Sequence, residues 1–119
     1  MTFKKVIEIL EADVILDKGN KDLEILSVCS SDLLSDLLHF AKKPQAILIT
    51  GMTNTHVVRT AEIADIIAIA FVLNKKPEKD TIEMARQKGI PLIVTRFSRF
   101  TACGRLFMEG LRSCTEDGI

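Results

Sequence analysis

Tryptophan and tyrosine are absent from this sequence of 119 residues, and its only aromatic residues are six phenylalanines. Because 47% of the residues are hydrophobic, the core must be built mainly from isoleucine, leucine and valine. A chain of this length is typical of one domain and is long enough to bury a core. Charged residues make up 27%, a composition that indicates a folded protein and excludes a disordered one.

The sequence also lacks an excess of charge of either sign, because 16 basic residues balance 16 acidic ones. No overall field attracts nucleic acid or an anionic membrane, so we expect neither as a partner. The longest apolar run, residues 66–73, is far shorter than the roughly 20 residues of a membrane-spanning helix. Glu8 and Glu11 interrupt the N-terminal stretch where a signal peptide requires an apolar run. These absences predict a cytoplasmic protein.

Cysteine is scarce, and its three positions, Cys29, Cys103 and Cys114, form no CxxC pair. An odd number without metal-ligand spacing argues against a disulfide framework and against a zinc site. His39 and His56 also lack metal-ligand spacing. We therefore expect reduced thiols, no metal and no cofactor.

The hydrophobic residues themselves follow two patterns, recurrence at spacings of three and four and short apolar runs. The first pattern predicts amphipathic helices, and the second predicts strands. The helices are expected at residues 6–10, 33–41, 57–63, 82–88 and 100–111. The strands are expected at residues 14–16, 23–28, 46–49, 66–72 and 90–95, with a turn cluster at 17–20. Capping residues precede the helices: Thr2; Ser30, Ser31 or Asp32; Thr53, Asn54 or Thr55; Asp80 or Thr81; and Ser98.

From residue 23 onward, strands and helices alternate in the order β-α-β-α-β-α-β-α. This alternation predicts a mostly parallel sheet with helices on both faces. The predicted fold class is therefore α/β, a single-domain α/β/α sandwich with a mostly parallel central sheet. No linker or repeat divides the chain, so residues 1–119 are predicted to form one domain, with residues 113–119 as a frayed tail.

Four polar turns follow the predicted parallel strands, at residues 29–32, 50–54, 74–76 and 95–98. Ligands of open α/β sheets bind at the carboxyl ends of the strands, where helix N-termini favour an anionic group. The predicted ligand-binding residues are Ser30, Asp32, Thr50, Gly51, Thr53, Asn54, Thr95, Arg96 and Ser98, with Lys75 as a further source of positive charge. The alternative is that these side chains only cap helices.

Catalytic interpretations find less support in the sequence. It contains neither the GxxxxGK[ST] of a P-loop kinase nor the GxGxxG of a dinucleotide site. Cys29 near a helix N-terminus is either a nucleophile or, more simply, a buried structural thiol. Asp32 and Asp36, one helical turn apart, are either part of a metal site or two solvated carboxylates. We expect no catalytic residue and no enzymatic activity.

A subunit interface is a further hypothesis. Met52, Val57 and Val58 place apolar side chains at a predicted turn and helix start, where they either contact a second subunit or complete the core. Small domains with a flat apolar helix face often pair by two-fold symmetry, so we expect a homodimer.

Three segments carry a resemblance to a known family: VCSSDLLSDLL at 28–38, ILITG at 47–51 and GIPLIVT at 89–95. Together they resemble a stand-alone DRTGG domain over roughly residues 6–111. The DRTGG string itself is absent, and TGMTN at 50–54 stands near its expected place. The turn positions that match the resemblance are Ser30, Asp32, Thr50, Gly51, Thr95 and Ser98.

The resemblance implies an α/β sandwich with a regulatory role. Such domains form the regulatory part of some phosphotransacetylases and of nucleotide-regulated CBS-domain pyrophosphatases, where they help to form a dimer. They are similar to the non-catalytic N-terminal domain of HPr kinase/phosphorylase, and small members are associated with carbohydrate metabolism. The sequence therefore predicts a dimeric, non-catalytic regulatory or ligand-sensing module. It is expected to bind a nucleotide or a phosphorylated metabolite, or to dock on a partner enzyme. The alternative is a structural interaction subunit of a metabolic enzyme complex without a small-molecule ligand.

Overall fold

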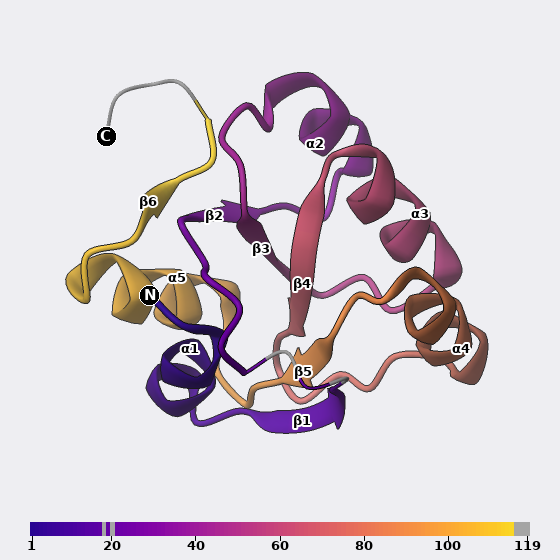
Figure 1. Ribbon diagram of the computed structural model, residues 1–119, viewed down its shortest axis with the longest axis horizontal. Helices are drawn as coiled ribbons and strands as arrows, with labels where there is room; N and C mark the ends of the chain where they lie inside the picture. Colours follow the sequence, from indigo (N-terminus) through magenta and orange to yellow (C-terminus); the bar gives the residue numbers. More distant parts are fainter. Residues whose placement is uncertain (18, 20, 116–119) are drawn as a thin grey trace.

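Two apolar segments form the centre of the sheet, where helices cover both faces and bury the side chains of every strand residue or nearly every one. They are β3 (Ala46–Thr50), which is buried throughout, and β4 (Ile66–Phe71), in which only Ile67 is partly exposed. The computed structural model describes residues 1–17, 19 and 21–115, and all statements on the fold refer to these residues. Figure 1 shows the sheet between two groups of helices.

The sheet has six strands in the order β1-β5-β4-β3-β2-β6 over the described residues. The outer strands are β1 (Asp13–Leu16), β5 (Leu92–Val94), β2 (Ser27–Ser30) and β6 (Arg112–Ser113). The pairs β2–β3, β3–β4 and β4–β5 are parallel, β6 is parallel to β2, and β1 is antiparallel to β5. The predicted mostly parallel sheet is therefore confirmed.

The two faces of the sheet carry separate helices and separate apolar clusters. On one face lie α2 (Leu34–Phe40), α3 (Thr55–Ile63) and α4 (Lys79–Lys88), which pack on one cluster. On the other lie α1 (Phe3–Leu10) and α5 (Arg99–Met108), which pack on the second cluster. Alternating strand residues divide between the clusters, as the pleat requires. This arrangement is the predicted α/β/α sandwich.

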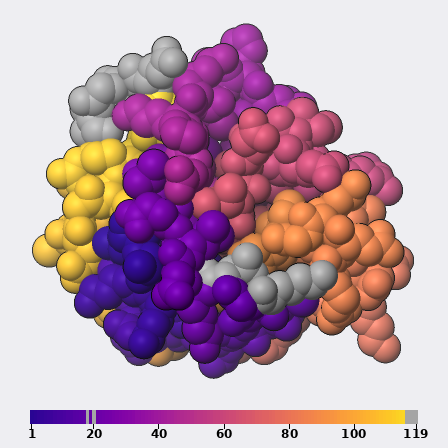
Figure 2. Space-filling view, viewed as in Figure 1, coloured from indigo at the N-terminus to yellow at the C-terminus, as the bar shows by residue number. Residues whose placement is uncertain are grey.

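The N-terminal segment lies against the last helix, although the two are far apart in the sequence. In Figure 2 the indigo N-terminal residues lie directly against the yellow C-terminal region. The Arg105 guanidinium donates to the Ile9 carbonyl at 3.3 Å and lies 3.4 Å from the Glu11 carboxylate. The end of α1 is thus joined to α5.

The segment before β2 differs from the prediction of a strand over 23–28. The strand begins at Ser27, while Glu24 forms an isolated antiparallel bridge with Thr2. The amide of Ile25 donates to the Met1 carbonyl at 2.7 Å. Residues 23–25 therefore use their backbone groups to hold the N-terminus, while the Leu26 amide donates to the Gln45 carbonyl at 2.9 Å.

The predicted cap of α2 is also wrong. Leu33 occupies the N-cap position and no side chain caps the helix. Ser31 instead forms a local turn, because its hydroxyl accepts from the Leu33 amide at 3.0 Å. Of the other capping predictions, Thr2, Asn54 and Ser98 are confirmed, whereas Glu78 stands at the N-cap position of α4 without a side-chain bond.

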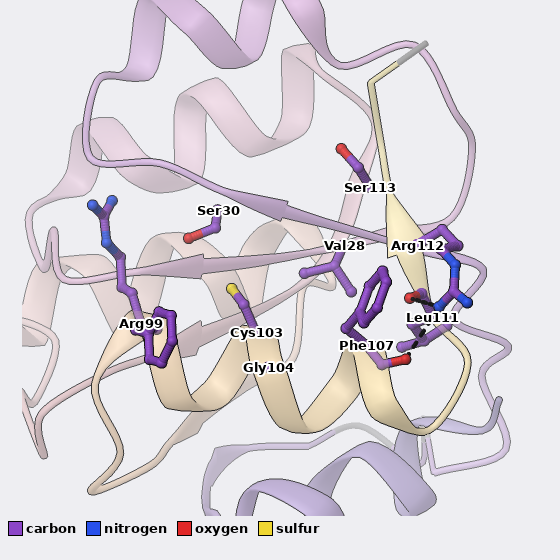
Figure 3. A pocket seen from close by; sticks show the side chains of 10 residues that line it. Val28, Ser30, Arg99, Cys103, Gly104, Phe107, Leu111, Arg112 and Ser113 are labelled. Carbon is purple, nitrogen blue, oxygen red and sulfur yellow. Dashed lines mark hydrogen bonds between the residues drawn. The ribbon is translucent and has the colours of Figure 1, made fainter. Parts of the chain in front are cut away.

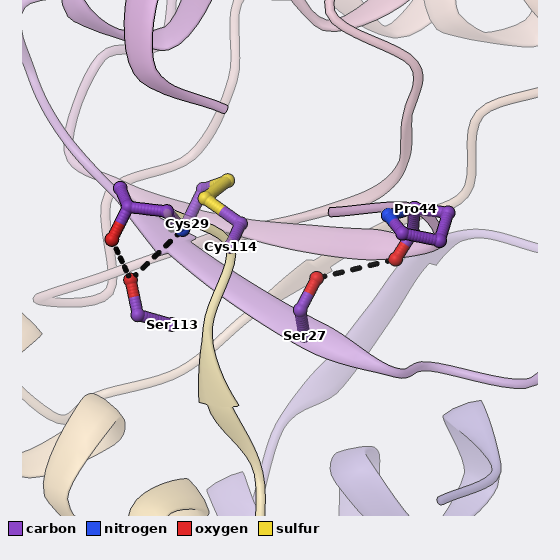
Figure 4. The surroundings of a disulfide bond; sticks show 6 residues. Ser27, Cys29, Pro44, Ser113 and Cys114 are labelled. Carbon is purple, nitrogen blue, oxygen red and sulfur yellow. Dashed lines mark hydrogen bonds between the residues drawn. A yellow bond between two sulfur atoms is a disulfide. The ribbon is translucent and has the colours of Figure 1, made fainter. Parts of the chain in front are cut away.

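The expectation of reduced thiols is wrong for two of the three cysteines. Cys29 on β2 and Cys114, directly after β6, form a disulfide with their Cα atoms 5.3 Å apart (Figure 4). Cys103 remains a free thiol. A separation of 85 residues hides this pair in the sequence, because it forms only when the last strand returns to β2.

The end of the chain differs from the predicted frayed tail as far as it is described. Ser113 belongs to β6, and the Cys114 amide donates to the Val28 carbonyl at 2.9 Å. The remaining residues, 116–119, lie outside the described residues, as do positions 18 and 20 of the predicted turn. None of the helices in the described part of the chain is long and apolar enough to cross a membrane.

Candidate functional site

The four parallel strands end at one rim of the sheet. Ser30, Thr50 and Thr95 stand at or just after the carboxyl ends of β2, β3 and β5, and the register of neighbouring strands aligns these ends. The loops that begin there are brought together as the alternation predicts.

Asp32 joins two of these loops. Its Oδ1 atom accepts a hydrogen bond from the Thr50 hydroxyl at 2.8 Å and another from the Gly51 amide at 2.9 Å. Partial burial raises the pKa of Asp32, whereas these hydrogen bonds and the positive charges of Arg99 and Lys75 lower it. The net effect is a pKa below the ordinary value of 3.8, so the carboxylate is ionised at neutral pH.

Two cations share this single carboxylate. The Arg99 guanidinium, at the start of α5, lies 3.5 Å from Asp32 Oδ1. Lys75, in the turn after β4, brings its Nζ atom so close to Gly51 that a methyl group there would lie 3.3 Å from it. The group formed by Asp32, Lys75 and Arg99 therefore carries one net positive charge beside Gly51.

Several predicted site residues use their polar groups inside the fold. The buried Thr95 hydroxyl donates to the Leu10 carbonyl at 2.7 Å and accepts from the Phe97 amide at 3.2 Å. The Asn54 side chain accepts from the His56 amide, and Ser98 accepts from the Thr101 amide. These bonds fix the ends of helices and strands.

Thr53 and Arg96 are engaged in other ways. The Thr53 carbonyl accepts from the Thr81 hydroxyl at 2.7 Å, which ties the loop after β3 to α4. The Arg96 guanidinium pairs with Glu11 at 2.9 Å and lies over the Phe97 ring. Of the two cations named in the sequence, Lys75 therefore lies beside Asp32, and Arg96 pairs with the end of α1.

A cavity of about 610 Å³ opens next to this rim, between α5 and the strands β2 and β6. Figure 3 shows α5 along one side and β2 and β6 along the other, with Arg99 and Arg112 at opposite ends. The described residues that line the cavity are Val28, Ser30, Arg99, Phe100, Cys103, Gly104, Phe107, Leu111, Arg112 and Ser113. Ser30 and Arg99 connect the cavity with the polar rim.

Sequence reasoning missed the part of this cavity that α5 provides. Ala102 and Leu106 form the buried stripe of the helix, while Phe100 is 89% exposed. Phe100 and Phe107 are seven residues apart, with Cys103 between them, and form a second apolar stripe beside the buried one. That second stripe is the sequence signal that indicates an unfilled helix face.

A smaller cavity of about 230 Å³ lies near the disulfide, where Asp36 is among its lining residues. Asp32 bonds to the loop after β3, so the two aspartates have different surroundings. Cys29 is 2% exposed and disulfide-bonded, which corrects both interpretations of it as a free thiol. Val57 and Val58 are fully buried and complete the core, so they are unavailable to a second subunit.

The sequence matches no protein-family model and no curated protein. The fold is similar to a crystal structure of the CBS and DRTGG domains of the regulatory region of Clostridium perfringens pyrophosphatase, complexed with its activator diadenosine tetraphosphate. The TM-score is 0.70 and the identity 18%, and the match covers 99% of this chain and 52% of that chain. The chain thus spans about half the length of the protein that it matches.

At this identity the likeness concerns the fold alone, and it supports a DRTGG-like α/β fold for this chain. The matched protein is a regulatory region rather than a catalytic domain. The predicted links to HPr kinase and to carbohydrate metabolism stay predictions.

Proposed function

We propose that this chain is a non-catalytic regulatory module that binds a small anionic ligand, a nucleotide or a phosphorylated metabolite. The observation that carries the proposal is the placement of two cations, Lys75 beside Gly51 and Arg99 beside Asp32, at the strand-end rim. The similarity in fold to a regulatory region that binds diadenosine tetraphosphate supports the same class of function.

The rim has donors to spare for an anion. The Asp32 and Arg99 side chains are 49% and 43% exposed, and such pairs contribute only about 0–1 kcal/mol. A phosphate therefore competes readily with Asp32 for the Arg99 guanidinium, a planar group suited to binding phosphate through two parallel hydrogen bonds. Lys75 supplies a second charge from the neighbouring loop. Binding at this place joins the loops after β2, β3 and β4 to α5, a change that a partner subunit can sense.

The test is the melting temperature in the presence of ATP, acetyl phosphate or glucose 6-phosphate. A ligand at 100 times its dissociation constant stabilises the folded state by about 2.7 kcal/mol, a clear upward shift. Arg99→Ala and Lys75→Ala are expected to remove most of that shift. Lys88→Ala is the matched control, because it deletes one positive charge at the far end of α4, where Lys88 pairs with Glu62. Unchanged melting temperatures with all three ligands would contradict the proposal.

A second candidate function is that of a structural interaction subunit, and the surface of α5 favours it. Phe100 and Met108 are 89% and 87% exposed on this helix. Large apolar side chains at such exposure are typical of contact surfaces when they cluster. In this case the three ligands leave the melting temperature unchanged, while Met108→Asp weakens association with the partner.

A further inference from the structure

The cavity beside α5 has the size and form of a small-molecule site. Its volume of about 610 Å³ falls within the roughly 300–1,000 Å³ typical of ligand pockets. Phe100, Cys103, Gly104 and Phe107 follow one another at spacings of three and four, so they lie on one face of the helix. From Phe100 to Phe107 this face extends for about 10 Å. Val28 and Leu111 add apolar surface from the opposite side.

The middle of the helix face is flat because of Gly104. A Cβ atom added at this position would have no heavy atom within 4 Å, so it would point into open space. With phenylalanines on both sides of this flat stretch, the helix face suits a planar ring, which aromatic side chains bind by stacking or edge contacts.

The charges along the cavity are of one sign. Arg99 and Arg112 stand at its two ends, and no carboxylate occurs among the described lining residues. Arg112 is occupied, because its NH1 group donates to the Phe107 and Leu111 carbonyls and its guanidinium lies 4.1 Å from the Phe107 ring centre. Within the described part of the chain, the Arg99 side chain has only the 3.5 Å contact with Asp32. The anion-binding end is therefore the Arg99 end.

Ser30 adds a neutral donor at that same end. It is exposed and lines the cavity, and its hydroxyl makes no hydrogen bond to other described residues. A phosphate between Ser30 and Arg99 also lies next to the rim group of Asp32 and Lys75. The cavity and the rim thus form one continuous binding surface, polar at one end and aromatic along α5.

We propose that the cavity binds the planar aromatic ring of a nucleotide, over Gly104 and Cys103 and between Phe100 and Phe107, with the phosphate at Arg99 and Ser30. The inference rests on the proposed function and narrows it, because a phosphosugar or an acyl phosphate has no planar aromatic ring to lie against α5. It also makes Cys103 a reporter, since the other two cysteines are joined in the disulfide.

The test measures the rate at which Cys103 reacts with a thiol reagent in the oxidised protein. ATP is expected to slow this reaction at least tenfold at saturation. Tripolyphosphate, which has the charge without the ring, is expected to leave the rate within twofold. Adenosine, which has the ring without the charge, is expected to protect only at far higher concentration.

Two variants examine the cavity directly through the dissociation constant of ATP. Gly104→Leu is expected to weaken binding at least tenfold without lowering the melting temperature, because its side chain fills open space. Phe100→Ala removes an exposed ring and is expected to weaken binding severalfold. Met108→Ala is the matched control: Met108 is equally exposed on α5 but does not line the cavity, so binding should not change.

The outcomes separate this inference from the broader proposal. If ATP raises the melting temperature but neither protects Cys103 nor responds to Gly104→Leu and Phe100→Ala, the ligand binds at the rim alone and the inference is overturned. Equal protection by tripolyphosphate overturns the ring-binding part. If no probe raises the melting temperature or protects Cys103, the inference and the proposed function both fail.

Discussion

Asp32 accepts hydrogen bonds that connect two loops, and its replacement should remove the acceptor of the Thr50 hydroxyl. The Thr50 hydroxyl is fully buried, so Asp32→Ala leaves a buried donor without a protein acceptor. Such losses cost about 1–3 kcal/mol. Because the Asp32 side chain is half exposed and water replaces part of the interaction, we expect a decrease near 1 kcal/mol in the free energy of unfolding, measured with urea at neutral pH.

The pH dependence of this loss follows from the direction of the Asp32 pKa shift. The pKa is lowered in the folded state, so the contribution of the carboxylate is complete above the ordinary value of 3.8 and disappears as the pH falls through the lower, folded-state pKa. The stability difference between the wild type and Asp32→Asn should therefore narrow below pH 3.8. A difference that stays constant into strong acid would show that the charge of Asp32 is unimportant.

At the scale of single residues, the sequence located the polar side chains at the strand ends, but it did not reveal which hydrogen bonds each of them makes. Asp32, Asn54 and Ser98 share the chemistry of helix caps, yet only the last two cap helices. Asp32 instead accepts from a loop that follows the next strand, and this partner depends on tertiary structure. The role of Thr95 was hidden for the same reason, because its acceptor, Leu10, lies 85 residues earlier.

At the scale of elements, the disulfide should govern how firmly β6 is held. The strand pairs with β2 through only two residue pairs, and Cys114 follows it directly. Reduction by a dithiol should lower the free energy of unfolding by about 2–4 kcal/mol, as is typical for a cross-link that closes a long loop. The measurement is chemical unfolding of the protein with and without reductant.

Two variants control this measurement. Cys114→Ser should have the stability of the reduced wild type and should not respond to reductant, whereas Cys103→Ser should behave as the wild type. Thiol titration of the unfolded, unreduced protein should find one thiol and not three. Three thiols, or a stability that is indifferent to reductant, would disprove the structural role of the bond.

The regular elements were predictable because their periodic patterns are local. The prediction of a strand over residues 66–72 agrees within one residue with Ile66–Phe71. The same reasoning failed where apolar residues serve another purpose, as at 23–25, whose backbone bonds hold the N-terminus. The strand β6 has two residues and no pattern of its own, so only its partner β2 defines it.

At the scale of the whole molecule, the predicted homodimer needs a surface other than the one suggested by Val57 and Val58. Exposed apolar side chains remain on α3 and α5, with Ile63 at 70% exposure and Met108 at 87%. Light scattering at micromolar concentration is expected to give about twice the 13.2 kDa mass of the chain, as for a closed two-fold pair. A constant mass of one chain over a wide concentration range would rule out the dimer.

The strand order explains why the cavity could not be foreseen. Alternation predicts parallel strands, but it does not reveal that the chain crosses from β5 over the sheet to place β6 outside β2. This crossing lays α5 along β2. One face of the helix, with Phe100, Cys103 and Phe107, extends beyond the strands and lines the cavity. The rim, which depends only on strand direction, was therefore predictable, and the cavity, which depends on strand order, was not.

The brevity of β6 has a consequence for the handling of the protein. In the oxidised chain the backbone of Ser27 and Val28 is shielded from foreign polypeptide by β6. Once the sulfur bridge is broken, two residue pairs are a weak shield, and the flank of β2 becomes a template for strand addition by another molecule. We therefore expect reducing buffers to favour aggregation of this protein, and the oxidised form to be better suited to concentrated samples.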